Sequence, residues 1–263
     1  MGKVWFIGAG PGAPDLLTVR GARLIGEAEV VIWARSLVNE GVLEHASPGA
    51  EVVESTTIPL EGVRQLYERA VAEDLRVARI HSGDPSIYGA VMEQVELCEE
   101  IGLEWEIVPG VSSLGAVAAA IGRELTVPEV SQSVILTRRA SRTPMPEGEE
   151  IRSFAAHGTM MAIFLSAARP RALQEELIDG GYAPDTPCAV VYKASWPDEI
   201  IIRCPLSELG ARVRAAKITT QALVLVGPAL GGGAGAGQSH VYDPHYGHRY
   251  RRLGAPNRYK KRV

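Results

Sequence analysis

Three loops in the N-terminal half carry the residue types that could bind a small ligand. Each follows a short apolar run and consists largely of small or helix-breaking residues: Gly8–Asp15 (GAGPGAPD), His81–Gly89 (HSGDPSIYG) and Pro109–Ser113 (PGVSS). Glycine and serine leave room for a ligand to lie against the backbone, whose N–H and C=O groups can then hold it. If the apolar runs are parallel strands of one sheet, the loops share its carboxyl edge, where open α/β folds bind ligands. The pattern therefore predicts one shared cleft.

The first loop, judged alone, is compatible with several interpretations. Gly8, Gly10 and Ala13 have the spacing of the dinucleotide fingerprint, in which N–H groups at a helix start bind a pyrophosphate. Two prolines in the same loop remove two of those donors, and Arg35 stands where a ribose-binding acid is expected. An NADP site that uses Arg35 and a tight turn without any ligand both remain open.

The other two loops also have purely structural interpretations. Asp84 followed by Pro85 is a common start of a helix, with the carboxylate as N-cap and the proline in the first turn. Ser112 could equally cap the helix that follows the third loop. The three loops together, rather than any one of them, favour a ligand site.

Several catalytic signatures are absent from the sequence. It contains no GxxxxGK[ST] phosphate loop, no GxSxG or HExxH motif, and no cysteine–histidine cluster before the C-terminal tail. A reaction that needs neither a strong protein nucleophile nor a metal fits better, and we assign no metal ligand. Alkyl transfer from a sulfonium is such a reaction, because the donor is already activated and the protein mainly aligns the reactants.

Short β-branched runs alternate with helical patterns and predict an α/β protein. The predicted strands are Val4–Ile7, Val30–Trp33, Val52–Ser55, Val77–His81, Trp105–Val108, Val134–Thr137, Met160–Leu165, Ala189–Tyr192, Ile200–Arg203 and Ala222–Val226. They predict two α/β/α domains, each around a roughly five-stranded, mostly parallel sheet, with the ligand cleft between them. We expect domains at residues 1–112 and 113–230, with a junction near the small-residue helix Ser113–Gly122. Residues 231–263 should form a flexible linker and a basic tail.

Charge limits the range of partners. The net charge of −4 divides into −10 before residue 239 and +6 from there to the end of the 263-residue chain. So acidic a body argues against nucleic acid as the main partner. We expect the tail, which contains His240, His245 and His248, to be solvated, with metal binding and an anionic or subunit contact as alternatives.

Composition also bears on location. Hydrophobic residues make up 46% of the chain, as in ordinary globular proteins, and the N-terminus lacks the pattern of a signal peptide. The longest apolar stretch, Val111–Ile121, is about half the length of a membrane span. Three cysteines lie among apolar residues, at Cys98, Cys188 and Cys204. We therefore expect a cytoplasmic protein with buried thiols and no membrane contact.

Four motifs, in order, resemble the tetrapyrrole methylases, a family of S-adenosylmethionine (SAM) methyltransferases. They are GAGPGAPDLLT near the start, SGDPSIYG, PGVSS, and TTQALVLVGPAL at Thr219–Leu230. The resemblance covers residues 3–230. It implies the fold of two α/β domains, a SAM cofactor that leaves as S-adenosylhomocysteine, a small-molecule tetrapyrrole substrate and a homodimer.

Within this family, three segments resemble the members that methylate carbon 11 of precorrin-4 in cobalamin biosynthesis. They are Ala34–Val38, Arg79–Gln94 and Leu136–Glu150. Uroporphyrinogen methylases instead have an aspartate after the second strand, so its role is not carried over to this chain. Trp33 and Arg35 also depart from the carbon-11 members and leave the local substrate contacts open. Another precorrin or uroporphyrinogen methylase, an NADP-dependent oxidoreductase and a binding-only protein are the alternatives, and cobalt in the ring is left open.

The resemblance also implies which residues contact the cofactor. In the N-terminal half they are Pro11, Ser82, Gly83, Asp84, Ile87, Ser112 and Ser113. In the C-terminal half they are Leu165, Ala194, Thr220 and Ala222. Among them, Asp84 could pair with the ammonium group of SAM or accept a hydrogen bond from its ribose, while the small residues allow close approach.

The acceptor ring carries acetate and propionate groups, which guanidinium groups bind bidentately. The residues expected to bind them are Arg35, Arg138, Arg139 and Arg142, with Arg79 and Arg123 as further candidates. Methylation at carbon leaves the ring with one excess proton. His81 and Tyr88 are weak candidates to steer that proton, although each could equally be a packed side chain. We assign no general base.

Overall fold

The first sheet is formed by residues near the N-terminus. The computed structural model describes residues 2–231, together with 239, 245–247 and 249, so the predicted linker and most of the tail lie outside the described residues. The strands are β1 (Lys3–Gly8), β2 (Val30–Trp33), β3 (Glu51–Glu54), β4 (Arg76–His81) and β5 (Glu104–Val108). Their order is β3-β2-β4-β1-β5, and every neighbouring pair is parallel.

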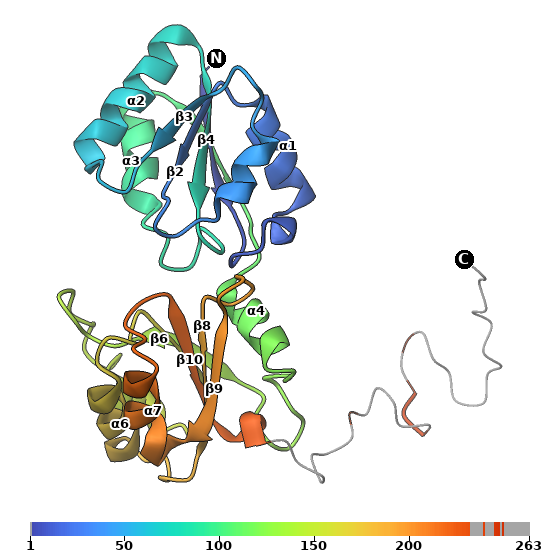
Figure 1. Cartoon of the computed structure of the whole chain (residues 1–263), viewed down its shortest axis with the longest axis vertical. Coiled ribbons are helices and arrows are strands. Elements are labelled where there is room, and N and C mark those ends of the chain that lie inside the picture. Colours follow the sequence, from blue (N-terminus) through green and yellow to red (C-terminus); the bar gives the residue numbers. More distant parts are fainter. Residues whose placement is uncertain (1, 232–238, 240–244, 248, 250–263) are drawn as a thin grey trace.

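Helices cover both faces of this sheet (Figure 1). They are α1 (Val19–Glu27) on one face, and α2 (Leu60–Glu73) and α3 (Met92–Ile101) on the other. Strand β1 illustrates the result, since Trp5 and Ile7 join the core beneath α1 while Val4 and Phe6 join the core beneath α2 and α3. A strand buried on both faces of a parallel sheet is continuously apolar, as in β1 and β2 here, whereas β3 and β5 at the sheet edges contain exposed glutamates.

The second sheet is mixed. Its strands are β6 (Val134–Arg138), β7 (Met160–Phe164), β8 (Pro187–Tyr192), β9 (Ile200–Pro205) and β10 (Ala222–Val226), in the order β6-β7-β10-β8-β9. Only β6 and β7 are parallel; the other neighbouring pairs are antiparallel. The prediction of a mostly parallel sheet is therefore wrong for this half. Strands β8 and β9 are joined by residues 193–199 alone, whereas a parallel crossover needs about a dozen residues or more.

Helices again lie on both faces of the second sheet. Helix α4 (Ser113–Ala120) packs Val117 against one face, while α5 (Ile151–Ala155), α6 (Pro170–Asp179) and α7 (Leu209–Ala215) cover the other. Short 3₁₀ segments complete the connections at Pro14–Leu16, Glu40–His45, Leu206–Glu208 and Pro228–Gly231. All the predicted strands exist, each within two residues of its predicted ends.

The three loops predicted to bind a ligand, Gly8–Asp15, His81–Gly89 and Pro109–Ser113, converge because β1 lies between β4 and β5. Gly10 donates its N–H to the carbonyl of Gly83 at 3.2 Å, and Gly83 returns a hydrogen bond to the carbonyl of Gly10 at 2.8 Å. Gly8 approaches the third loop so closely that a Cβ placed on it would lie 2.6 Å from the Cα of Gly110. The predicted convergence at one sheet edge is confirmed.

Two findings bear on the predicted environment. Cys98, Cys188 and Cys204 are all buried, and none forms a disulfide. Among the described residues, no helix is both long and apolar enough to cross a bilayer.

We expect Gly110→Ala to destabilise the fold by about 1–3 kcal/mol, because the new methyl would overlap the carbonyl oxygen of Gly83 and crowd Gly8. Urea unfolding would measure the loss. The matched control is Gly115→Ala in α4, where an added Cβ meets nothing within 4 Å. That variant should be stabilised by up to about 1 kcal/mol through helix propensity. Equal stability of the two variants would contradict the close approach of the loops.

Candidate functional site

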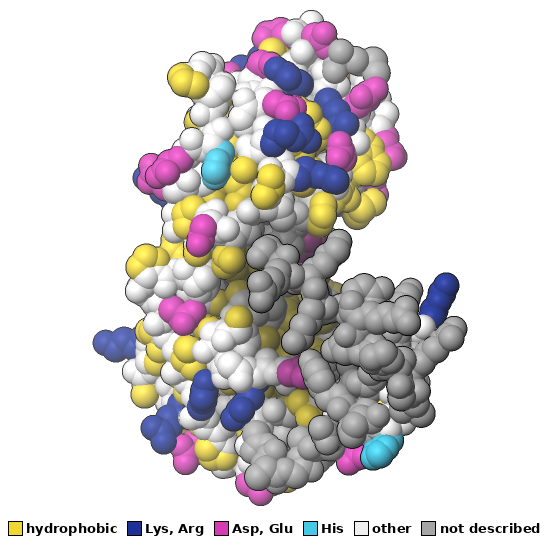
Figure 2. All heavy atoms as spheres, turned by 90° about the vertical axis from the view of Figure 1, so that its right-hand side faces the viewer, with side chains coloured by type: hydrophobic (Ala, Val, Ile, Leu, Met, Phe, Trp, Pro, Cys, Tyr) yellow, Lys and Arg dark blue, Asp and Glu magenta, His cyan; other side chains and the backbone are white. Residues whose placement is uncertain are grey.

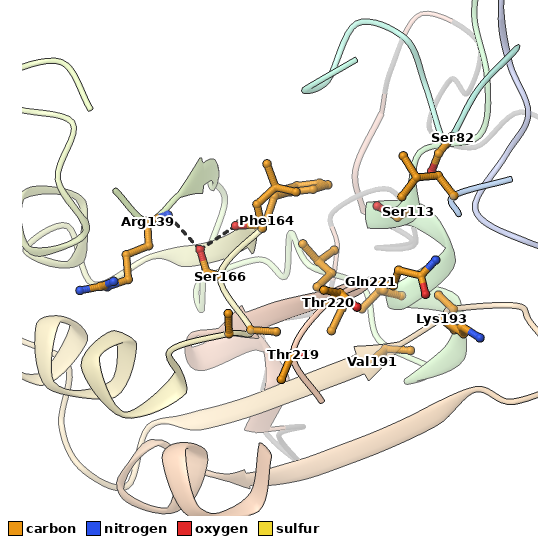
Figure 3. A pocket seen from close by; sticks show the side chains of 18 of the residues that line it. Ser82, Ser113, Arg139, Phe164, Ser166, Val191, Lys193, Thr219, Thr220 and Gln221 are labelled. Atoms are coloured by element: carbon orange, nitrogen blue, oxygen red, sulfur yellow. Dashed lines mark hydrogen bonds between the residues drawn. The ribbon is translucent and has the colours of Figure 1, made fainter. Parts of the chain in front are cut away.

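A cavity of about 690 Å³ lies between the two sheets. The first half contributes Pro11, Leu37 and Ser82 from its loops, and Ser113 comes from the start of α4. The second half contributes the segments that follow β6, β7 and β8, together with the residues that lead into β10: Arg139–Arg142, Phe164–Arg169, Lys193–Ala194, Trp196 and Thr219–Leu223. Figure 3 shows the labelled side chains of both halves arranged around this space.

Direct contacts join the two halves beside this cavity. The indole Nε1 of Trp196 donates to the carbonyl of Pro11 at 3.1 Å, and Gly12 is so near that any Cβ on it would overlap the ring. Ala13 N–H donates to Ser195 Oγ at 3.0 Å. On the other side, the rings of Tyr88 and Phe164 meet with centroids 5.3 Å apart. The first loop is therefore clamped to the segment that follows β8.

Backbone strain is concentrated around the cavity. Leu165, Lys193 and Gln221 line it and have φ values of +52°, +48° and +51°, in the left-handed region that costs energy for a residue with a Cβ. The neighbouring residue Ser195 has φ +68°, and Tyr88, which packs against Phe164, has φ +54°. Such strain persists where the surrounding structure imposes it, and it clusters at functional sites.

Asp84 links the second and third loops. Its carboxylate accepts hydrogen bonds from the N–H of Ser86 and of Gly110, both at 2.8 Å, and from the hydroxyl of Ser86. Partial burial would raise its pKa, but these hydrogen bonds outweigh burial and hold the pKa below the ordinary value of 3.8. The structural alternative of an N-cap is wrong, because turns follow Pro85 and helix α3 begins only at Met92.

The predicted cofactor residues separate into two groups. Those that line the cavity are Pro11, Ser82, Ser113, Leu165, Ala194, Thr220 and Ala222. Those that lie in the same loops without lining it are Gly83, Asp84, Ile87 and Ser112. Ser112 instead caps α4, with Oγ accepting from Leu114 N–H at 3.2 Å, which bears out its structural interpretation.

The dinucleotide interpretation of the first loop loses its structural basis. A pyrophosphate would need free N–H groups at the start of the following helix. Helix α1 begins only at Val19, and its first turn is capped by Thr18, whose Oγ1 accepts from Gly21 N–H at 3.0 Å.

The predicted substrate arginines are placed unevenly. Arg139 and Arg142 line the cavity, but the guanidinium of Arg139 is paired with Glu176 at 2.7 Å. Arg138 donates to the carbonyls of its own loop, at Thr143 and Pro144.

Two further arginines do not line the cavity. Arg35 is exposed, and its backbone N–H binds Glu54. Arg79 is a part-buried side chain bound to Gln94 and Ser55, and burial lowers its pKa.

The weak catalytic candidates also lie outside the cavity lining. His81 is 8% exposed, and burial, followed by the nearby charge of Arg79, lowers its pKa to about 3, so the imidazole is neutral. Burial raises the pKa of Tyr88, whose ring packs on Phe164. No Asp, Glu, His, Cys or Tyr side chain is among the described residues that line the cavity.

Sequence reasoning missed several lining residues, including Trp196, Gln221 and Arg169. The expectation that ligands bind at the carboxyl edge of a sheet applies only to loops that follow parallel strands. Because β10 runs antiparallel to β7 and β8, its amino end at Ala222 lies beside the carboxyl end of β8 at Tyr192. The segment leading into β10 therefore reaches the site from the opposite chain direction. The family motif at Thr219–Leu230 indicated Thr220 and Ala222, but strand direction gave no signal for Gln221, Trp196 or Arg169.

Cationic side chains lie toward both ends of the cavity. Ser82, Ser113 and Lys193 lie toward one end and Arg139 at the other, with Thr220 between them (Figure 3). Both cations are paired, Lys193 with Asp198 and Arg139 with Glu176. Ser166 helps to build the arginine end, since its hydroxyl accepts from Arg139 N–H at 2.9 Å and donates to the carbonyl of Phe164 at 2.6 Å. The surface differs, since acidic and basic side chains intermingle over the upper half in Figure 2.

Two α/β sheets with a cavity between them are the architecture that this chain shares with methyltransferases of the tetrapyrrole type. The model of the tetrapyrrole (corrin/porphyrin) methylases matches residues 3–210, and the chain belongs to this family. It is 46% identical to the cobalt-precorrin-4 C(11)-methyltransferase of Methanocaldococcus jannaschii, over 95% of this chain and 96% of the relative.

Solved structures agree. The X-ray structure of a cobalt precorrin-4 methyltransferase superposes with a TM-score of 0.84 at 45% identity, covering 87% of this chain and 95% of that chain. The uroporphyrin-III C-methyltransferase of Thermus thermophilus, solved in complex with S-adenosylhomocysteine, has a TM-score of 0.71 at 31% identity, with coverages of 87% and 93%.

We expect Asp84→Asn to lower the free energy of unfolding at neutral pH by about 1–2 kcal/mol. In the wild type one carboxylate oxygen accepts from Ser86 N–H and the other from Gly110 N–H. In asparagine one of these oxygens is replaced by an NH2 group, which is itself a donor and would face one of the two N–H groups. Since the folded-state pKa of Asp84 lies below 3.8, its contribution is present above that pH and is lost as the pH falls further. Unfolding measured from pH 7 to pH 3 should thus show the two proteins converging. A constant gap would refute this assignment.

Proposed function

We propose that the protein is a SAM-dependent C-methyltransferase that methylates carbon 11 of precorrin-4, with or without cobalt in the ring, to give precorrin-5. The observation that carries the proposal is the cavity between the sheets, lined by Pro11, Ser82 and Ser113 on one side and by Thr220 and Ala222 on the other. Family membership supports it, as do the activity named for the similar relative and the S-adenosylhomocysteine named for the Thermus structure.

The residues at the loop end of the cavity fit a sulfonium nucleoside. The volume of about 690 Å³ is in the range of pockets that enclose small organic ligands. Pro11, Ser82 and Ser113 bring no cation to this end, and the ammonium of Lys193 is paired with Asp198 at 2.6 Å. A positively charged donor is therefore not repelled there, and small side chains let it approach the backbone.

The chain's own residues would act by binding and orientation. SAM supplies an electrophilic methyl group, and activation of the acceptor carbon resides in the enamine-like ring. The loops would hold the donor from one side and the segment 219–222 from the other, so that these residues would orient it toward the acceptor. The hydrogen bond from Trp196 to the carbonyl of Pro11 holds the two sides of the cavity at a fixed position relative to each other. The methyl transfer itself needs no proton-transfer residue at the cavity wall, and loss of the excess ring proton is a separate step to which we assign no residue.

We further propose a cytoplasmic homodimer. The family resemblance supports the dimer, and three buried thiols without disulfides are typical of a reducing compartment. Against the NADP-dependent alternative stand the late start and the side-chain cap of α1.

Thr220→Trp should weaken binding of S-adenosylhomocysteine by tenfold or more, about 1.4 kcal/mol, because the indole would occupy volume at the middle of the cavity. Calorimetry on the folded protein would measure it. The matched control is Thr126→Trp, an exposed threonine that does not line the cavity, and its affinity should equal that of the wild type. Unchanged affinity in Thr220→Trp would remove this cavity as the donor site.

The reaction itself is tested with precorrin-4 and SAM carrying an isotopically labelled methyl group. We expect a product heavier by one methylene, with NMR placing the label on carbon 11. Label on another ring carbon would indicate a different precorrin methylase. Tight NADP binding without binding of S-adenosylhomocysteine would overturn the proposal in favour of an oxidoreductase.

A further inference from the structure

A second hollow adjoins the arginine end of the main cavity. It has a volume of about 340 Å³ and shares Ala168, Arg169 and Thr219 with the main cavity. Its wall is formed by the start of α6 and by the end of α7 with the residues that follow it. Four cationic side chains line it, at Arg169, Arg171, Arg214 and Lys217, and no acidic side chain does so among the described residues.

These four cations are not neutralised within the described part of the chain. All four residues are exposed, and none has an acidic partner within ion-pair distance. By contrast, Arg139 and Arg212, which lie nearby in sequence or space, are paired with Glu176 and Glu208. An unpaired cluster of like charges is unusual in a body whose net charge is −10.

The amino end of α6 contributes to the positive potential of the hollow. Arg169 is the N-cap of α6 and Arg171 lies in its first turn, which contains no acidic residue. The amino end of a helix is positive, so cations there oppose the macrodipole and lower stability. Helices α1 and α5 also begin with an arginine at the second position and no acidic residue in the first turn, so this pattern alone does not distinguish α6. At α6 the helix end adds its positive field to the four cations of the hollow, which favours an anion there.

We propose that this hollow binds peripheral carboxylates of the tetrapyrrole acceptor, through Arg171, Arg214 and Lys217 together with Arg169 at its junction with the main cavity. The inference rests on the proposed function. It replaces Arg138 and Arg139 as anchors, since their guanidinium groups are engaged by loop carbonyls and by Glu176. Guanidinium forks match acetate and propionate groups, which the ring carries around its rim.

This placement orients the ring. The donor binds at the loop end, where the lining has no unpaired cation, and the ring rim is held at the opposite end by four. Anchoring the rim outside the main cavity sets which carbon faces the methyl group without a charged side chain beside the reacting atoms. The hollow thus acts as a specificity-determining anchor.

The test uses the full chain and uroporphyrin, a stable tetrapyrrole with a carboxylate on every peripheral arm, as the probe. The variant is Arg171→Gln/Arg214→Gln, in which glutamine keeps the Cγ that packs against Gly210. We expect fluorescence titration to show affinity for uroporphyrin weakened by about tenfold, with a shallower salt dependence. S-adenosylhomocysteine affinity should not change. The matched control, Arg212→Gln, removes an α7 cation that is outside the hollow and paired with Glu208.

A second readout separates binding from structure. Because Arg171 opposes the α6 dipole, the single variant Arg171→Gln should melt at the same temperature as the wild type or higher, while still binding uroporphyrin more weakly. Equal uroporphyrin affinity in wild type, double variant and control would overturn the inference, as would failure of the wild type to bind uroporphyrin. If S-adenosylhomocysteine also failed to bind the wild type, the proposed function would fall with it.

Discussion

The reciprocal hydrogen bonds between Gly10 and Gly83 are the constraint on which the rest of the site depends. They join the loops after β1 and β4 backbone to backbone, and the carboxylate of Asp84 ties the third loop in through Gly110. Side chains larger than hydrogen would separate these loops, as the crowding around Gly8 and Gly110 demonstrates. The order of β4, β1 and β5 brings the loops within reach, and the glycines allow them to touch.

The second half completes the site by a different route. In its mixed sheet β10 runs antiparallel to β7 and β8. The segment before β10 and the segments after β7 and β8 therefore meet at the same edge of the sheet. Several of these residues have positive φ values, which the clamp of Trp196 and Ser195 on the first loop helps to maintain. One wall is thus built from glycine-rich bends and the other from strained residues with side chains.

The uneven distribution of unpaired cations determines which end of the site each reactant would favour. The loop end has no unpaired cation, whereas Arg142 lines the main cavity and four unpaired cations line the adjoining hollow. A positively charged donor and a polycarboxylate acceptor would each be favoured at opposite ends, which suits a reaction that depends on alignment rather than on a catalytic base.

The sequence by itself determined the strands, the position of the three ligand loops and the family. Short-range signals suffice for these, because β-branched runs, helix-breaking residues and motif order are local properties. Tertiary structure decided the rest. The antiparallel course of β10, the capture of Arg139 by Glu176 and the burial of His81 each depend on which distant residue becomes a neighbour. An arginine in a loop has the same local pattern whether its partner is a glutamate of another helix or a ligand, so only the folded chain could show that Arg139 is paired with Glu176 and that Arg138 donates to carbonyls of its own loop.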